Sequence, residues 1–256
     1  MILAKRLLNI LDGMLSFMMG VLLLVTVAWT CYALWDGYQI MHDVQETREA
    51  LQALKPTTDE NSSGEESFGF LPLQQMNGDV CAWLTLENTA IDYPVVQGQN
   101  NEEYLSKGAD GTFHLGGSIF LDFRNSRDFD ESYSLLYGHF MADSGMFGDL
   151  IWYRDASFFK NNRQGLLLLP DGNRVLHVAC WMQASESEPL IFDPEYAAQN
   201  RTQLLDYAEA HAEQMDPEEI QGLRNRTEPI LAMTTCTEEP SDGLRMVVLA
   251  RMEEAV

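Results

Sequence analysis

Positively charged residues are scarce in this sequence. It has 16 Lys and Arg residues against 39 Asp and Glu residues, which gives a formal net charge of −23 at pH 7. The first 36 residues hold two charges of each sign, so residues 37–256 carry the whole excess. Such a negative surface repels nucleic acid and anionic lipid, so no nucleic-acid partner is expected. It would attract a cationic partner, although the same charge also keeps a protein soluble.

Cysteine is also rare, with four residues in the chain. Cys31 lies in a long apolar run, and Cys81 and Cys180 could form a disulfide if the domain lies outside the cytoplasm. Cys236 then has no evident partner. A single thiol in an oxidising compartment is more readily explained by reactivity than by structure.

The chain shows no internal repeat and no acidic cluster with the spacing of an EF-hand calcium loop. His177 and Cys180 are three residues apart in an expected strand, where that spacing places side chains on opposite faces. They are not expected to share a metal ion, and no metal site is predicted.

The first 36 residues differ from the rest of the chain. Lys5 and Arg6 precede the uncharged residues 13–34, and Asp36 follows them. A helix of this length rises about 33 Å, which is enough to cross a bilayer core of roughly 30 Å. The run is longer than the apolar part of a cleaved signal peptide, so we predict an uncleaved single-pass membrane anchor. The basic end is expected in the cytoplasm, with the remaining chain outside.

Two further regions follow this anchor, which occupies residues 1–36. Residues 37–70 show helical spacing at first and then a polar, acidic stretch whose composition does not support packing. They are predicted to form a juxtamembrane helix and a flexible linker. Residues 71–256 are predicted to be one folded domain, because a chain with 46% hydrophobic residues can bury a full core.

Short apolar runs bounded by turn residues predict that this domain is mostly β. A short helix is expected at residues 150–160, and one or two helices between residues 192 and 223. The expected strands lie within residues 80–88, 89–98, 114–125, 133–137, 164–183, 230–236 and 245–250.

Three chemically active side chains stand at the ends of these predicted strands. Cys236 ends one strand, Arg245 opens the next, and His139 follows the run Tyr133–Tyr137. A thiol can attack a carbonyl carbon, an imidazole can move the proton, and a guanidinium can stabilise the resulting oxyanion. Alternatively, Cys236 is a small core residue and Arg245 a surface charge, since free cysteine is often buried. The histidine at a third strand end favours the catalytic interpretation.

The segments around these residues resemble a known family. LLYGHFM around His139, LAMTTC at Cys236 and LRMVVLA at Arg245 resemble the three signature segments of sortases, the cysteine transpeptidases of Gram-positive cell envelopes. GSIFLDFRN upstream of His139 is similar to class B sortases. The resemblance covers residues 79–252. It implies a closed β-barrel of about eight strands with peripheral helices, including a helical insertion before the strand of Cys236.

The resemblance also implies a reaction. Cys236 would be the nucleophile, His139 the general acid/base and Arg245 the group that stabilises the transition state. The enzyme would cleave the sorting signal of a surface protein after threonine, form a thioester and transfer the acyl group to an amine of a peptidoglycan precursor or a pilin. No cofactor is implied. The residues expected near the substrate are Thr234, Thr235, Glu238, Asn101, Tyr104 and Leu105.

Other assignments remain open at this point. Tyr104 and Leu105 are equally well explained as core residues, and Glu238 as a solvated loop carboxylate. A cysteine hydrolase or an L,D-transpeptidase would use the same thiol and imidazole, although the latter usually carries a Ser-x-Gly-Cys segment that is absent before Cys236. A non-catalytic, membrane-anchored binding module would explain the anchor and the acidic charge, but not three reactive residues at strand ends.

Overall fold

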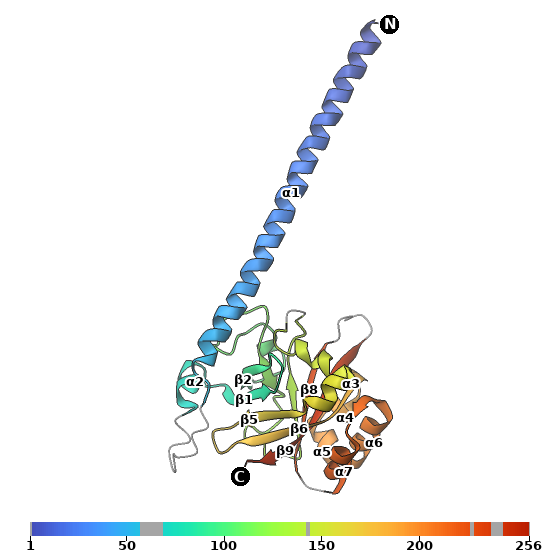
Figure 1. Cartoon of the computed structure of the whole chain (residues 1–256). Coiled ribbons are helices and arrows are strands. Elements are labelled where there is room, and N and C mark those ends of the chain that lie inside the picture. The colour runs from blue at the N-terminus through green and yellow to red at the C-terminus, as the bar shows by residue number, and fades with distance from the viewer. Residues whose placement is uncertain (1, 57–68, 142–143, 226–227, 237–242, 256) are drawn as a thin grey trace. The chain divides into compact units, whose positions relative to one another are not determined.

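The computed structural model describes residues 2–56, 69–141, 144–225, 228–236 and 243–255 (Figure 1). The chain divides into two compact units, Met1–Thr47 and Arg48–Val256.

The N-terminal unit consists of most of one long helix, α1 (Ile2–Gln52). Its segment Asn9–Trp35 contains a stretch with a mean hydropathy of 2.2 and is long and apolar enough to cross a membrane. The apolar side chains of this segment, from Leu11 to Trp35, are exposed rather than covered by protein. The predicted N-terminal apolar helix is therefore confirmed as a candidate membrane span.

The second unit is built on a closed β-barrel (Figure 1). Its strands are β1 (Val80–Leu86), β2 (Asp92–Val96), β3 (Ile119–Leu121), β4 (Tyr133–Tyr137), β5 (Gln164–Leu168), β6 (Arg174–Ser185), β7 (Ala212–Met215), β8 (Ile230–Cys236) and β9 (Leu244–Glu254). The order β5-β1-β2-β3-β4-β8-β9-β6 closes on itself because β5 also pairs with β6, and β7 extends the sheet from β6. The predicted barrel of about eight strands is confirmed.

Helices surround this barrel and fill the connection between β6 and β8. They are α2 (Leu71–Met76), η2 (Glu103–Leu105), η3 (Gly148–Arg154), α3 (Ala156–Asn161), α4 (Pro189–Phe192), α5 (Pro194–Gln199), α6 (Arg201–His211) and α7 (Pro217–Asn225). Helices α4 to α7 gather on one side of the barrel and form the predicted insertion before the strand of Cys236 (Figure 1).

This insertion is more divided than the sequence pattern predicts. One or two helices were expected between residues 192 and 223, whereas α5, α6, the short strand β7 and α7 follow one another there, with α4 directly before them. Pro189, Pro194 and Pro217 each open a new helix, because proline is favourable at a first helical position and disruptive inside a helix. The Asp193 side chain caps α5 by accepting a hydrogen bond from the Tyr196 backbone.

Strand β8 is buried on both faces. Leu231 and Met233 point into the barrel core, while Ile230 and Ala232 join the apolar cluster beneath the insertion. This explains why the sequence of β8 is a continuous apolar run rather than an alternating one. The strand that ends at Cys236 is therefore held between two hydrophobic layers.

A β-bulge in β6 corrects one expectation. The register with β9 shifts between Val178 and Cys180, and both Ala179 and Cys180 belong to the cluster beneath the insertion. His177, which lies between the barrel-core residues Leu176 and Val178, is thus on the same side as Cys180. Within the described residues, no group of three or more His, Cys, Asp or Glu side chains could hold a metal ion.

The barrel unit begins N-terminal to residue 71. Leu51 is buried with Phe70 and Leu73 against β1 and β2. The Lys55 ammonium donates hydrogen bonds to Asp92 (2.7 Å) and to Thr85 (3.0 Å). The end of α1 is thereby part of the barrel unit, while most of the predicted linker lies outside the described residues.

Leu51 tests this attachment. In residues 37–256, Leu51→Ala should lower the free energy of unfolding by about 2–3 kcal/mol, the usual loss for truncating a buried leucine. Urea unfolding followed by tryptophan fluorescence measures this. Met76→Ala is the matched control, because Met76 is 38% exposed on α2. Equal effects of the two substitutions would show that the end of α1 does not stabilise the barrel.

Candidate active site

The strand register brings the three predicted catalytic residues to one edge of the barrel. Strands β4 and β8 are parallel, with Tyr137 opposite Thr234, and the Gly138 N–H donates to the Thr234 carbonyl oxygen (3.2 Å). His139 and Cys236 each follow two residues later, so the two neighbouring strands deliver them at the same level. Strands β8 and β9 are antiparallel, and Cys236 lies directly opposite Arg245. The three residues thus form one row across adjacent strands.

A backbone carbonyl group from a distant segment of the chain orients the His139 side chain. Its Nε2 atom lies 2.8 Å from the carbonyl oxygen of Leu105, at the end of η2. Because a carbonyl oxygen only accepts, Nε2 carries a hydrogen in this contact, and Nδ1 is left to accept or carry the second proton. The preceding Gly138 is required for space, since a Cβ there would lie 2.7 Å from the ring of Phe147.

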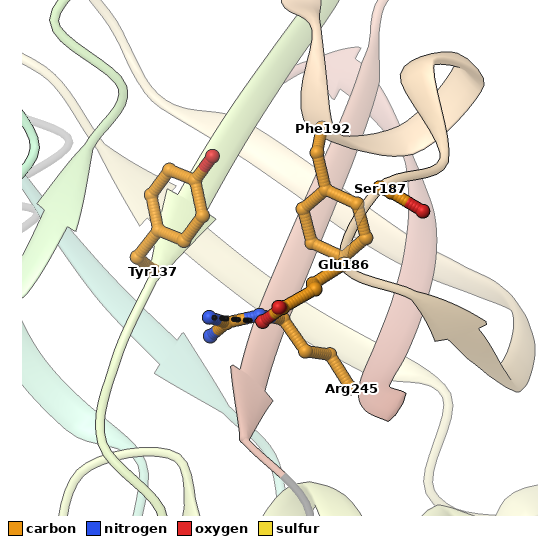
Figure 2. Close-up of a pocket in the computed structure, with 5 residues that line it drawn as sticks. All are labelled: Tyr137, Glu186, Ser187, Phe192 and Arg245. Atoms are coloured by element: carbon orange, nitrogen blue, oxygen red, sulfur yellow. Dashed lines mark hydrogen bonds and ion pairs between the residues drawn. The ribbon is translucent and has the colours of Figure 1, made fainter. Parts of the chain in front are cut away.

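Arg245 lines a pocket of about 390 Å³ together with Tyr137, Glu186, Ser187 and Phe192. Figure 2 shows Tyr137 on one side and the segment from Glu186 to Phe192 on the other, with Arg245 between them. The Nη2 atom of Arg245 is 3.3 Å from a carboxylate oxygen of Glu186. The pocket therefore presents a guanidinium, a carboxylate and two aromatic rings to a ligand.

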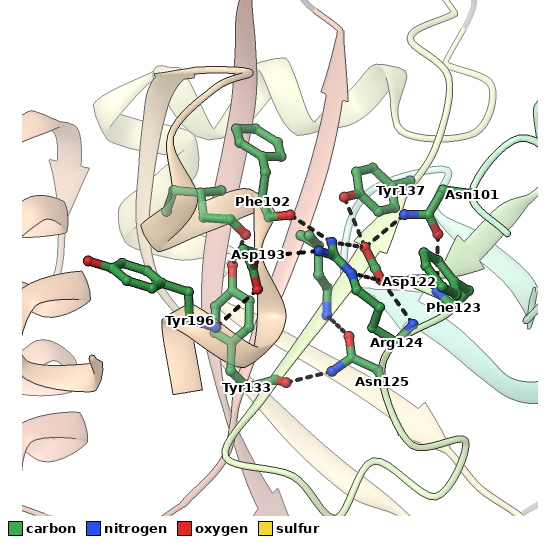
Figure 3. Close-up of polar contacts among 12 residues, drawn as sticks. Asn101, Asp122, Phe123, Arg124, Asn125, Tyr133, Tyr137, Phe192, Asp193 and Tyr196 are labelled. Atoms are coloured by element: carbon green, nitrogen blue, oxygen red, sulfur yellow. Dashed lines mark hydrogen bonds and ion pairs between the residues drawn. The ribbon is translucent and has the colours of Figure 1, made fainter. Parts of the chain in front are cut away.

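A buried carboxylate connects this pocket to its surroundings (Figure 3). Asp122 is fully buried and accepts hydrogen bonds from Arg124 (2.8 Å), Asn101 (2.8 Å) and the Tyr137 hydroxyl (3.2 Å). Arg124 also donates to the Phe192 carbonyl oxygen in the insertion (2.8 Å). Asp122 thus links the segment of Asn101, strand β4 and the helical insertion.

The same network sets the charge of its members. Burial raises the pKa of Asp122, but the hydrogen bonds from Arg124 and Asn101 lower it more, so its pKa falls below the ordinary value. Burial, followed by the nearby Asp122 carboxylate, raises the pKa of Tyr137. At neutral pH the network therefore contains an ionised aspartate and a neutral tyrosine that donates to it.

The predicted substrate residues divide into two groups. Leu105 is 44% exposed and contacts His139 through its carbonyl oxygen, and Asn101 belongs to the Asp122 network beside Tyr137. Both lie near the site. Glu238 lies outside the described residues.

The structure corrects the expectation that Tyr104, Thr234 and Thr235 line the substrate groove. The Tyr104 side chain is completely buried, and its hydroxyl donates to Asp79 (2.7 Å), so it is a core residue. Thr234 is also buried and donates to the Met246 carbonyl oxygen (2.9 Å). Thr235 is 1% exposed, and within the described part of the chain its hydroxyl has no hydrogen-bond partner. Their hydroxyls face the protein interior because strand β8 is covered on both sides.

Several residues of the site were missed by reasoning from the sequence. Glu186 and Phe192 follow the end of β6, and nothing in their local pattern shows which strand end lies beside them. Tyr137 occupies the last position of a recognised strand, where its side chain was counted as part of an apolar run. Asp122 lies in the segment GSIFLDFRN, where a charged residue directly after an apolar run was the available signal.

Comparisons with known proteins give consistent matches, although no family model matches the chain. Sortase B of Listeria monocytogenes is 34% identical over 133 residues, which cover 49% of this chain and 54% of that protein. Sortase B of Staphylococcus aureus is 36% identical over 94 residues, covering 37% of this chain and 38% of that protein. The chain therefore matches about half or less of the length of these curated relatives.

Among solved structures, a class B sortase of Streptococcus pyogenes involved in pilus biogenesis superimposes with a TM-score of 0.64. The two are 31% identical, and the match covers 72% of this chain and 97% of that chain. The match thus extends over almost the whole of that structure.

Asp122→Asn tests the buried network. A carboxylate with a lowered folded-state pKa stabilises the fold above its unfolded pKa, and this contribution is lost as the pH falls through the folded pKa. In residues 37–256 the variant should be less stable at pH 7 by about 3 kcal/mol, as for a buried ion pair that loses its charge. The difference should shrink progressively below about pH 4, because the carboxyl of the unfolded wild-type chain begins to gain its proton there and the folded carboxyl follows only at lower pH.

Urea unfolding at a series of pH values from 7 to 3 measures both effects. Glu102→Gln removes an exposed carboxylate and is the matched control. A stability difference for Asp122→Asn that stays constant over this range would contradict the role of the ionised carboxylate.

Proposed function

The chain is a class B-like member of the sortase family, and we propose that it acts as a membrane-anchored cysteine transpeptidase. The strand register supports this most directly, because it brings His139, Cys236 and Arg245 to one edge of the barrel. The pocket beside Arg245 provides space for the substrate. A binding module would not need a thiol, an imidazole and a guanidinium in one row.

The reaction follows from the chemistry of these groups. The Cys236 thiolate attacks the carbonyl carbon of a threonine in the sorting signal, and Arg245 stabilises the oxyanion of the tetrahedral intermediate. The C–N bond then breaks, and the His139 imidazolium gives its proton to the departing amine. The acyl group is left on Cys236 as a thioester. A second amine, deprotonated by His139, attacks the thioester and releases the thiolate.

The partners and location are part of the same proposal. The acyl donors are surface proteins that carry a sorting signal, and the acceptor is an amine of a peptidoglycan precursor or of a pilin. A pilin is included because the Streptococcus pyogenes relative is involved in pilus biogenesis. Residues 13–34 anchor the chain in the cell membrane. Lys5 and Arg6 then lie in the cytoplasm and the barrel unit lies outside. Asn101, Leu105 and Glu238 are proposed to line the substrate groove.

Loss of each catalytic side chain is the first test. With the full chain in detergent and fluorogenic peptides of the x-Pro-x-Thr type, Cys236→Ala should abolish cleavage. His139→Ala and Arg245→Ala should lower the rate about 10²–10⁴-fold and about 10²–10³-fold, respectively. Transfer to an added amine, followed by mass spectrometry, should disappear in parallel.

Cys31→Ala removes a thiol of the apolar helix and is the control, with activity expected to equal that of the wild type. Cleavage that survives Cys236→Ala would refute the mechanism and support a binding module with contaminating activity. Cleavage that depends on Cys236 but never yields a transfer product would instead identify a hydrolase.

Thiol reactivity is an independent test. Burial raises the pKa of Cys81 and that of Cys180 to about 12, so neither forms a thiolate at neutral pH. In folded residues 37–256 an alkylating reagent at pH 7.5 should therefore modify one cysteine per chain, Cys236. Peptide mapping identifies the site. In urea all three cysteines should react, and rapid modification of Cys81 or Cys180 in the folded protein would show that the assignment of the reactive thiol is wrong.

A further inference from the structure

Glu186 has a fixed place beside Arg245 in the sheet. In the antiparallel ladder of β6 and β9, Ala184 lies opposite Arg245 and Ser185 opposite Leu244. The ladder continues one step further, because the Glu186 N–H donates to the Gly243 carbonyl oxygen (3.0 Å). Glu186 is therefore two residues beyond the direct partner of Arg245, on the same face, in the diagonal position where long side chains meet.

This placement extends the catalytic row by one strand. The strands β4, β8, β9 and β6 are consecutive neighbours in the barrel. Their ends carry His139, Cys236, Arg245 and Glu186 in that order. The side chains of the last two meet at 3.3 Å in the pocket (Figure 2). The carboxylate thus stands beside the guanidinium on the side away from the nucleophile.

A guanidinium in this place needs a partner that limits its direction. The ladder fixes the backbone of Arg245, but the side chain has several rotatable bonds and loses rotamer entropy when it is held in one orientation. A carboxylate that contacts one side of the planar fork limits the rotation of the guanidinium and so sets the direction in which its other N–H groups point. In many catalytic sites the general base is oriented in the same way, by a third side chain that does not touch the substrate.

We propose that Glu186 is a positioning residue that holds the Arg245 guanidinium in the orientation needed to stabilise the oxyanion. This inference rests on the proposed transpeptidase function, since it assigns Glu186 a role in that reaction. Glu186 acts through Arg245 and not on the substrate. It is distinct from Glu238, the carboxylate near Cys236 that the sequence suggested.

The exposure of the pair makes the proposal testable without loss of the fold. The side chains of Arg245 and Glu186 are 29% and 59% exposed. Ion pairs this accessible contribute little to stability. Glu186→Gln, which keeps the size of the side chain and removes its charge, should therefore unfold at the same denaturant concentration as the wild type.

A double-mutant cycle measures the coupling between the two residues. The four full-length chains are the wild type, Glu186→Gln, Arg245→Lys and the double variant. The acyl-transfer rate of each chain is measured in detergent. Thioester formation is followed in single turnovers by mass spectrometry. Glu186→Gln should lower kcat about tenfold with KM changed less than about twofold, as expected for losing a charge-assisted contact that orients a catalytic group. In the Arg245→Lys background, where the fork is absent, the same change should alter the rate less than about twofold.

Two further variants sharpen this result. Glu186→Asp keeps the carboxylate on a shorter stem, and its kcat should lie between those of wild type and Glu186→Gln. Glu195→Gln removes an exposed carboxylate from α5 of the same insertion, and it should leave both kcat and KM unchanged.

Three outcomes would overturn the proposal. They are an unchanged kcat in Glu186→Gln, an equal loss in both Arg245 backgrounds, and a rise in KM alone, which would assign Glu186 to substrate binding. If one of these outcomes is found while the activity of the wild-type enzyme still depends on Cys236, only the role of Glu186 is rejected. Transfer activity that does not depend on Cys236 rejects the proposed function and this inference together.

Discussion

Strand β8 is held in register by two ladders at once, a parallel one with β4 and an antiparallel one with β9. A slip of one residue in either ladder would move position 236 out of line with positions 139 and 245 on the neighbouring strands. Leu231 and Met233 are packed in the barrel core, and Ile230 and Ala232 are packed beneath the insertion, so a slip would require both apolar layers to repack. The geometry of the reactive row is therefore a consequence of hydrophobic packing below it.

Polar contacts around Asp122 hold the two sides of the pocket together. Asp122 is a buried charge, which is tolerated because Arg124, Asn101 and Tyr137 all donate to it. Since Arg124 also contacts the insertion, the wall of the pocket that carries Phe192 is tied to the wall that carries Tyr137. The sheet fixes strand ends, and this network fixes the distance between the two sides of the pocket.

The sequence predicted those features that depend on local pattern. The strand ends at His139, Cys236 and Arg245 could be found because each borders a short apolar run, and the barrel and its insertion followed from the family resemblance. It did not predict that Thr234 faces inward, because a strand covered on both faces has no alternation to show direction. Glu186 was missed because its position depends on the length of β6 and on the bulge at Ala179, and neither leaves a local signal. For Tyr104 the sequence left a groove and a core position open, because an aromatic residue followed by leucine fits either one, and the structure places it in the core.

The many acidic side chains of the chain and the single carboxylate of Glu186 act on Arg245 over different distances. At physiological salt, interactions between exposed charges are largely screened beyond about 8 Å, so most of the 39 acidic side chains have little effect on Arg245. A carboxylate at 3.3 Å is well inside that range. The distributed charge can therefore act on a cationic molecule in solution, while the orientation of Arg245 is governed by its immediate neighbours. An acidic surface is compatible with an oriented guanidinium, because a carboxylate at contact distance acts on it more strongly than the many distant ones.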